Sequence, residues 1–295
     1  MIERIFRSDT PIVDWAAFDP EDFSGVPEWA LGEVLKTLHP DSFVTQYCMG
    51  YGFARSDAPV VYHAGVALSL LAACVPQYLS FTSDDLRTNL YTCLVGTTRA
   101  SRKTHCIRLG LRVLDGVPAI NQSAMHAHMG RSIPEPGSAE QLTDFVIANP
   151  QVVVYIQEFG GLLSESAKGG YKESVRQRLT ELADAMPLQR ATRGKKNDMP
   201  VQKDPRLSLL AGCTPAHLEG YTRAHDWTTG FLARFLFLYA QRDRFWPRGR
   251  RGAHAIEMES WLNTRLPVLS EMRGVYEAAF DPEADAGRLA LGVDD

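Results

Sequence analysis

The segment LYTCLV at residues 90–95, followed by GTTRASRKT at residues 96–104, largely decides the fold of this chain. The first part is a short, apolar, β-rich run that ends at a glycine, which predicts a buried strand. Helical spacing of apolar residues begins at His105 and continues to Leu114. A buried strand, a polar loop that ends in Lys103-Thr104, and a helix stand in the order that a phosphate-binding loop requires.

In such a loop, backbone N–H groups surround the phosphates, the lysine reaches the terminal phosphates, and the hydroxyl after it binds Mg²⁺. We therefore expect Thr104 to bind Mg²⁺ and the whole loop to bind the nucleotide, through Gly96, Thr97, Thr98, Ser101, Arg102, Lys103 and Thr104. The usual pattern GxxxxGK[ST] is not matched, because Thr97 and Arg102 stand where its glycines belong and Gly96 lies one residue early. An exposed basic turn is the alternative.

A second strand leads into an acidic residue. QVVVYI, residues 151–156, is the clearest strand signal in the chain and is followed by Gln157-Glu158. ATPases use an acid pair at this point, the first acid to hold Mg²⁺ through water and the second to polarise the attacking water. Glu158 is our candidate base, and Gln157 stands at the metal position, where a neutral amide holds hydrated Mg²⁺ more weakly than Asp. An ordinary strand-end carboxylate is the alternative for Glu158.

Strand and helix signals alternate along the rest of the chain. Strands are expected at 90–95, 151–156, 207–211 and 235–239, and helices at 29–38, 62–75, 105–114, 172–186 and 257–280. The helix at 172–186 would bury Val175, Leu179, Leu182 and Met186, and residues 120–137 are expected to be irregular. This alternation predicts an α/β fold with a mainly parallel sheet flanked by helices. We divide the chain into an acidic, helical N-terminal region (1–80), a core (81–245) and a C-terminal helical region (246–295).

Composition excludes several classes of protein. The chain has 295 residues, 31 Lys+Arg, 35 Asp+Glu and 45% apolar residues, which is ordinary for a globular protein. The longest apolar run, residues 64–75, is too short for a bilayer, and the start MIERIFRSD is no signal peptide, so we expect a cytoplasmic protein without a membrane segment. Five scattered cysteines without a CxxC pair indicate reduced thiols.

The order of five passages resembles one family. They are SDAPVVYHAGVALSLLA (56–72), LRTNLYTCLVGTTRASRKTH (86–105), VVVYIQEFGGLL (152–163), DPRLSLLAGCTPAHLEGY (204–221) and TTGFLARFLFLY (228–239). Together they are similar to the P-loop ATPase domain of unknown function found in the helicase half of phage, plasmid and prophage primase–helicase proteins. The resemblance covers roughly residues 43–245. It implies a RecA-like P-loop NTPase fold, with ATP and Mg²⁺ as cofactors.

The resemblance also assigns roles to two residues beyond the loop and the acid. Thr214, which follows the strand LSLLAGC, would be a polar sensor of the γ-phosphate. Arg234, in GFLAR, would be an arginine finger acting across a subunit interface, which implies a homo-oligomer. An arginine adds positive charge to the transition state that Lys103 alone does not supply. A structural salt bridge is the alternative for Arg234.

The charge distribution points to a nucleic-acid partner. Residues 1–41 contain nine acidic and three basic residues, whereas residues 168–206 contain ten basic and five acidic ones. A basic loop with Arg190, Arg193, Lys195 and Lys196 is the candidate DNA contact, with single-stranded DNA favoured. A solvated surface loop is the alternative.

We therefore expect a Mg²⁺-dependent, helicase-like ATPase that acts on DNA in mobile-element replication. The alternative is a nucleotide-binding adaptor that hydrolyses ATP weakly and recruits replication proteins, which Gln157 favours. A third possibility is a P-loop protein that acts on something other than nucleic acid.

Overall fold

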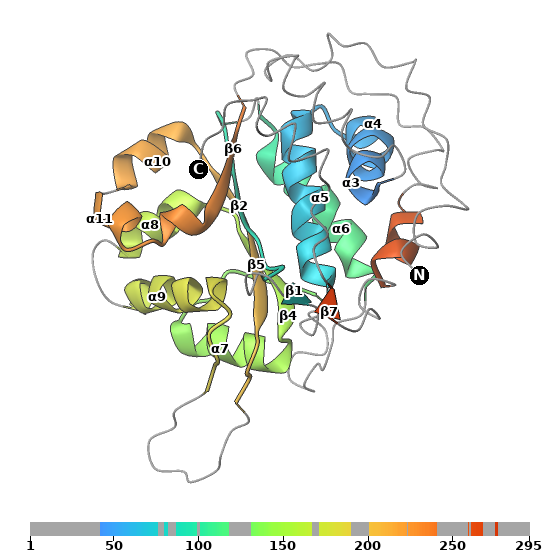
Figure 1. Ribbon diagram of the computed structural model, residues 1–295. Helices are drawn as coiled ribbons and strands as arrows, with labels where there is room; N and C mark the ends of the chain where they lie inside the picture. Colours follow the sequence, from blue (N-terminus) through green and yellow to red (C-terminus); the bar gives the residue numbers. More distant parts are fainter. Residues whose placement is uncertain are drawn as a thin grey trace, which may run out of the picture.

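Five parallel strands form one sheet with helices on both faces (Figure 1). This computed structural model describes residues 42–75, 80–81, 87–98, 101–117, 131–166, 171–189, 201–222, 224–240, 259, 261–267 and 275–276. The sheet confirms the expected α/β class and is consistent with a RecA-like fold. No helix within these ranges has both the length and the apolar character needed to cross a bilayer.

The order of the strands in the main sheet is β3-β4-β5-β2-β6. Their bounds are β2 (Tyr91–Val95), β3 (Ser132–Ile133), β4 (Gln151–Ile156), β5 (Arg206–Cys213) and β6 (Phe235–Tyr239). β5 therefore lies between β2 and β4, with Val95 opposite Cys213 and Ile156 opposite Ala211. β2 and β5 are buried along their whole length, as expected of strands that helices cover on both faces. A second, two-stranded sheet pairs β1 (Ser80–Phe81) with β7 (Val275–Tyr276).

Helices fill the connections between the strands. Before the main sheet come α3 (Phe43–Thr45), the π-helix η3 (Gln46–Gly52), α4 (Phe53–Arg55) and α5 (Val60–Cys74). Within it come α6 (Lys103–Asp115), α7 (Ala139–Ala148), α8 (Phe159–Ser166), α9 (Tyr171–Ala183), α10 (Pro215–Tyr221), α11 (Ala224–Thr228) and the 3₁₀ turn η5 (Leu232–Arg234). Residues 261–267 are also helical.

The strand order fixes which helix covers which face. The connection from β2 to β3 runs one way across the sheet, whereas the later connections run the other way. Because parallel crossovers are right-handed, α6 lies on one face with α5, and α7, α8 and α9 lie on the other (Figure 1). The reversal occurs between β2 and β5, and in open α/β sheets ligands bind at the carboxyl ends of the strands at such a point.

Alternate residues of each strand enter two hydrophobic cores. On β4, Val153 packs into the core with α5 and α6, whereas Val152 and Val154 pack into the core with α7, α8 and α9. α5 approaches the sheet closely at Gly65, where a side chain would meet Leu238 and Thr92. Thus α5, which belongs to the region 1–80 of the expected division, packs directly on the sheet.

Several sequence predictions differ from the structure. Met186 lies beyond the end of α9 with 53% of its surface exposed, because the chain turns at Ala185, so the predicted buried face ends at Leu182. Residues 275–276 are a strand, so the helix predicted over 257–280 is wrong there. The segment predicted as irregular contains β3, and α7 was not anticipated. The helix predicted at 29–38 lies outside the described residues.

Candidate functional site

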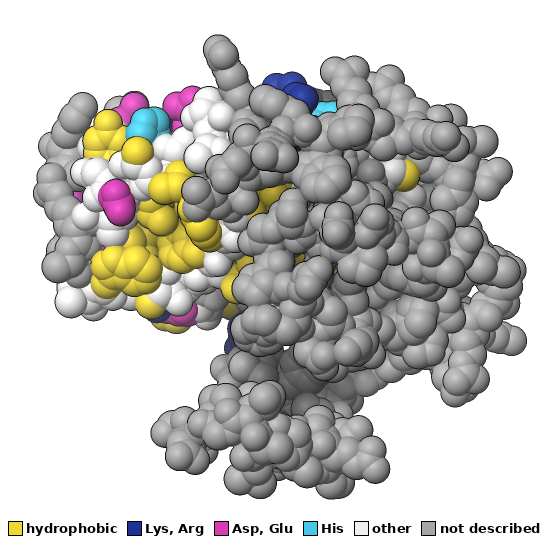
Figure 2. Space-filling model, turned by 90° about the horizontal axis from the view of Figure 1, so that it is seen from above, with side chains coloured by type: hydrophobic (Ala, Val, Ile, Leu, Met, Phe, Trp, Pro, Cys, Tyr) yellow, Lys and Arg dark blue, Asp and Glu magenta, His cyan; other side chains and the backbone are white. Residues whose placement is uncertain are grey.

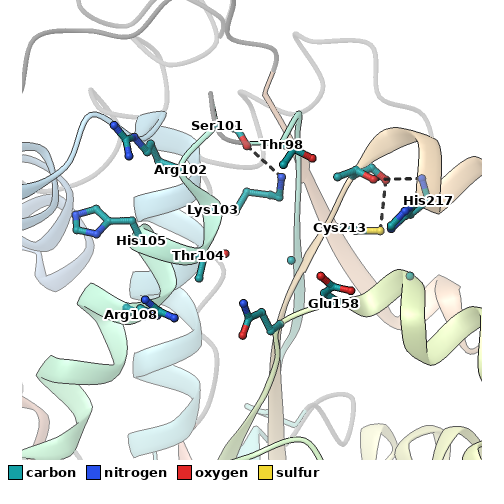
Figure 3. Close-up of a pocket in the computed structure, with 14 residues that line it drawn as sticks. Thr98, Ser101, Arg102, Lys103, Thr104, His105, Arg108, Glu158, Cys213 and His217 are labelled. Carbon is teal, nitrogen blue, oxygen red and sulfur yellow. Dashed lines mark hydrogen bonds between the residues drawn. The ribbon is translucent and has the colours of Figure 1, made fainter.

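The carboxyl ends of three neighbouring strands meet around a cavity of about 400 Å³ (Figure 3). β2 leads into the loop at 96–104, β4 into Gln157-Glu158, and β5 into Thr214. The cavity lies at the reversal point described above. Its lining residues are Thr98, Ser101, Arg102, Lys103, Thr104, His105, Arg108, Gln157, Glu158, Gly160, Gly212, Cys213, Thr214 and His217. The structure thus brings most of the predicted site residues together.

The start of the loop is fixed by close packing around Gly96. Its N–H donates to the carbonyl of Cys213 (3.1 Å), and a side chain here would meet the hydroxyl of Tyr62 and the carbonyl of Ala240. The Tyr62 hydroxyl itself donates to the carbonyls of Val95 (2.6 Å) and Ala240 (3.2 Å). Only glycine fits at position 96, which explains the glycine one residue ahead of the usual pattern.

Lys103 is held at the centre of its own loop. Its Nζ donates to the carbonyls of Gly96 (2.5 Å) and Thr97 (3.1 Å) and to Oγ of Ser101 (3.1 Å). Burial lowers the pKa of Lys103, and the thiols of Cys213 and Cys93 oppose that shift. The ammonium group therefore sits in a ring of oxygen acceptors at the cavity wall (Figure 3).

Arg102 adopts the backbone conformation that a glycine would favour. Its φ of 53° lies in the left-handed region, which costs a residue with a side chain about 1 kcal/mol. Its Nε lies 3.3 Å from Oδ1 of Asp57, an ion pair that holds the side chain at the cavity edge. The tight turn of the loop is therefore made at Arg102 despite the missing glycine.

The first turn of α6 faces the cavity with Lys103 and Thr104. A helix N-terminus offers unpaired N–H groups and a partial positive charge to an anion. The described lining residues include Arg102, Lys103 and Arg108 as cations, and Glu158 is the only acid among them. The cavity is therefore suited to an anionic ligand.

Magnesium fits this edge only in part. Thr104 offers a hydroxyl, but Gln157 offers an amide where a carboxylate is needed, and the cation Arg108 also lines the cavity. No group of three or more His, Cys, Asp or Glu side chains that could hold a metal occurs in the described part of the chain. Because Mg²⁺ is held by carboxylates together with substrate phosphates, the donors present do not form a complete magnesium site.

Glu158 is exposed and reaches the cavity from the end of β4. Its backbone carbonyl accepts the N–H of Gly161 (2.9 Å) in the first turn of α8, and its carboxylate faces the cavity (Figure 3). Glu158 thus places a carboxylate in the same cavity as Lys103 and the N-terminus of α6, and its role as a base stays a prediction.

Thr214 is the N-cap of α10. Its hydroxyl accepts the N–H of His217 (3.3 Å) while the residue lines the cavity. His217 packs on Gly160, where a side chain would meet its Cβ at 2.7 Å. The hydroxyl oxygen thus caps α10, α10 is held against α8, and the sensor role of Thr214 stays a prediction.

Arg234 lies at the opposite edge of the sheet from the cavity of its own chain, because it precedes β6. Its guanidinium pairs with Asp184 through Nε (2.8 Å) and Nη2 (2.6 Å), and it donates to the carbonyl of Gly230 (2.6 Å). Asp184 raises the pKa of Arg234. These contacts are the structural salt bridge named as the alternative, and a role across subunits stays a prediction.

The candidate DNA contacts Arg190, Arg193, Lys195 and Lys196 lie outside the described residues. Figure 2 looks down on the molecule and shows hydrophobic side chains gathered over the part formed by α10, α11 and β6. Exposed members of that region are Tyr221, Trp227, Leu236 and Tyr239.

Sequence reasoning missed six of the residues that line the cavity: His105, Arg108, Gly160, Gly212, Cys213 and His217. His105 and Arg108 lie on α6 after Lys103, and the spacing of four residues from Thr104 was the available signal for Arg108. His217 follows Thr214 by one turn of a helix capped by that threonine.

No protein-family model matches the chain, and no relative is found among the curated proteins. The resemblance drawn from the five passages therefore stays a prediction.

Proposed function

We propose that this chain binds the phosphates of a nucleoside triphosphate, ATP in the first instance, in the cavity at the carboxyl ends of β2, β4 and β5. The observation that carries the proposal is Lys103, whose ammonium lies inside the loop at the first turn of α6. The excess of cations among the cavity-lining residues also supports an anionic ligand.

Hydrolysis would use residues of the same cavity. Glu158 would take a proton from the attacking water, while Lys103 and the N–H groups at the start of α6 stabilise charge on the phosphoryl oxygens. The Thr214 hydroxyl would donate to a γ-phosphate oxygen. Coupling of this cycle to single-stranded DNA in a homo-oligomer is the wider form of the proposal, and it rests on the resemblance alone.

A second candidate is a nucleotide-binding adaptor that hydrolyses ATP weakly and recruits replication proteins. The observation that favours it is the amide of Gln157 at the edge of the cavity, where the acid needed to hold Mg²⁺ is expected. Binding is common to both candidates, so only turnover by the unaltered protein separates them.

The test is ATP binding by calorimetry and ATP turnover with and without single-stranded DNA. Lys103→Ala should lower ATP affinity by about 100-fold, because charge-assisted bonds to phosphate contribute up to about 3 kcal/mol. Glu158→Gln should preserve binding and abolish turnover. Lys203→Ala and Glu219→Gln are matched controls, since both residues are exposed and absent from the cavity lining.

DNA-stimulated turnover lost in both site variants would support the motor. Binding without turnover would support the adaptor. Absence of ATP binding by the unaltered chain would overturn both candidates.

A further inference from the structure

Arg108 is a third cation at the cavity, and its surroundings differ from those of its neighbours. It lies on α6 four residues after Thr104, which puts both side chains on one face of the helix. Its guanidinium points toward the cavity below Thr104 (Figure 3). The side chain is exposed, so its charge is in contact with the solvent that fills the cavity.

The neighbouring arginines are occupied by carboxylates. Arg102 pairs with Asp57 (3.3 Å), and Arg112, one turn after Arg108, pairs with Glu259 (3.4 Å). Arg108 forms no hydrogen bond or ion pair with another residue in the described part of the chain. A guanidinium at a cavity wall that has no such partner among the described residues is available for an anion, and guanidinium groups bind phosphate through two parallel hydrogen bonds.

The acid that would hold a hydrated cation is missing at the same level of the cavity. Burial raises the pKa of Tyr155, which lies on β4 two residues before Gln157, and the guanidinium of Arg108 opposes that rise. Gln157 directly follows β4 and lines the cavity together with Arg108. An amide and a guanidinium thus line the cavity in which a carboxylate would be needed to attract Mg²⁺.

We propose that this cavity binds nucleotide phosphates with the Arg108 guanidinium in the position of the divalent cation, so that ATP binding does not require Mg²⁺. The inference rests on the proposed function and adds that nucleotide binding needs no divalent cation. Arg108 would neutralise phosphate charge as a metal ion does in magnesium-dependent nucleotide sites. A divalent cation beside the guanidinium would be repelled. Gln157 removes the carboxylate that would otherwise offset that repulsion.

The test compares ATP binding by calorimetry in excess Mg²⁺ and in excess EDTA. We expect the two dissociation constants to agree within about threefold. Affinity that falls tenfold or more in EDTA would overturn the inference while leaving the proposed function intact. Absence of binding in both buffers would overturn the proposed function and this inference with it, so the two failures are distinguishable.

Variants test whether Arg108 is the responsible group. Arg108→Gln should weaken ATP binding in EDTA by about tenfold, the loss expected for a charge-assisted bond. Arg112→Gln, on the same helix, is the matched control and should leave the dissociation constants unchanged in both buffers. Equal behaviour of the two variants would overturn the assignment, and thermal unfolding of both shows that each is folded.

The combined change Arg108→Gln and Gln157→Asp should create a magnesium-dependent site. Its ATP affinity should be at least about tenfold higher in Mg²⁺ than in EDTA, since a carboxylate beside Thr104 then holds the hydrated ion. An affinity that stays the same in the two buffers would contradict the role given to these two side chains.

Discussion

Polar and charged side chains lie at both ends of the strands of the main sheet, which we call its amino edge and its carboxyl edge. Their contacts differ between the two edges. At the amino edge, Arg131 is 1% exposed and donates to the carbonyl of Ala73 (3.1 Å). Gln151, which begins β4, donates to the carbonyl of Val75. At the carboxyl edge, Lys103 and Glu158 face a cavity.

Helix polarity explains this difference. α5 ends at the amino edge, where the last carbonyls of a helix lack partners and accept hydrogen bonds from nearby donors. α6 begins at the carboxyl edge, where N–H groups and a lysine face outward. Polar residues at the amino edge therefore stabilise the fold, whereas those at the carboxyl edge are available to a ligand.

The largest expected contrast comes from Lys103→Ala. ATP affinity should fall by about 100-fold, or ~3 kcal/mol, while the free energy of unfolding changes by less than about 1 kcal/mol, as for most accessible positions. Calorimetry and urea unfolding of the same preparation measure both. A loss of stability as large as the loss of affinity would make Lys103 a structural residue and remove the contrast between the edges.

Arg131→Ala should give the opposite result. We expect a loss of about 2 kcal/mol of unfolding free energy, because the buried stem loses its packing and the Ala73 carbonyl loses its donor. ATP affinity should change by less than twofold. Urea unfolding measures the first quantity. Unchanged stability would show that buried polar contacts at the amino edge do not support the fold.

His63 is a fully buried polar residue that contacts α6, and it allows the same question to be asked of the core. Its Nδ1 lies 3.2 Å from Sγ of Cys106, and burial lowers its pKa to about 3. The unfolded chain, with a pKa near 6.5, gains a proton as the pH falls and the folded chain does not. Stability should therefore fall by about 1.4 kcal/mol between pH 7.5 and 5.5.

The change His63→Leu removes this titration, so its stability should vary less over that pH range than that of the unaltered chain. Unfolding free energies at the two pH values, measured for both proteins, provide the check. Identical slopes would mean that His63 does not carry the acid sensitivity.

The smallest expected effect concerns Arg102 and Ala185, the two non-glycine residues with positive φ in the described part of the chain, one near each edge. Ala185 (φ 51°) follows α9, where the N–H of Met186 donates to the carbonyl of Glu181 (3.0 Å) and that of Ala185 to Leu182 (3.1 Å). Such a helix end favours glycine. Ala185→Gly should raise the free energy of unfolding by up to about 1 kcal/mol.

Arg102→Gly relieves the same strain at the other edge but also removes the ion pair with Asp57, so we expect a smaller gain in stability. ATP affinity should fall by a few-fold for Arg102→Gly and stay constant for Ala185→Gly. Calorimetry distinguishes the two, and equal affinities for both variants would place Arg102 among the structural residues.

Strands that are apolar on both faces were predictable from sequence. β4 and β6 have the predicted bounds, and β2 differs by one residue, because consecutive apolar residues bounded by polar ones leave little freedom in where a buried strand ends. The end of the strand at 151–156 then gave the positions of Gln157 and Glu158, whereas Thr214 was assigned only through the family resemblance.

Contacts between distant segments were not predictable. The insertion of β5 between β2 and β4 brings Thr214 to the cavity, and nothing in a single sequence specifies that neighbour. The partner of Arg234 is 50 residues away, and β3 is two residues long with no periodicity to detect. In the sequence, Arg108 is indistinguishable from any other surface arginine of a helix. Its place at the cavity follows only from the packing of α6 against the sheet.

The Tyr62 hydroxyl gives the loop a mechanical connection to another part of the chain. One oxygen bridges the carbonyl of Val95, immediately before the loop, and the carbonyl of Ala240, immediately after β6. The start of the loop and the end of β6 are therefore tied to the same side chain of α5. Tyr62→Phe would keep the ring and cut this linkage.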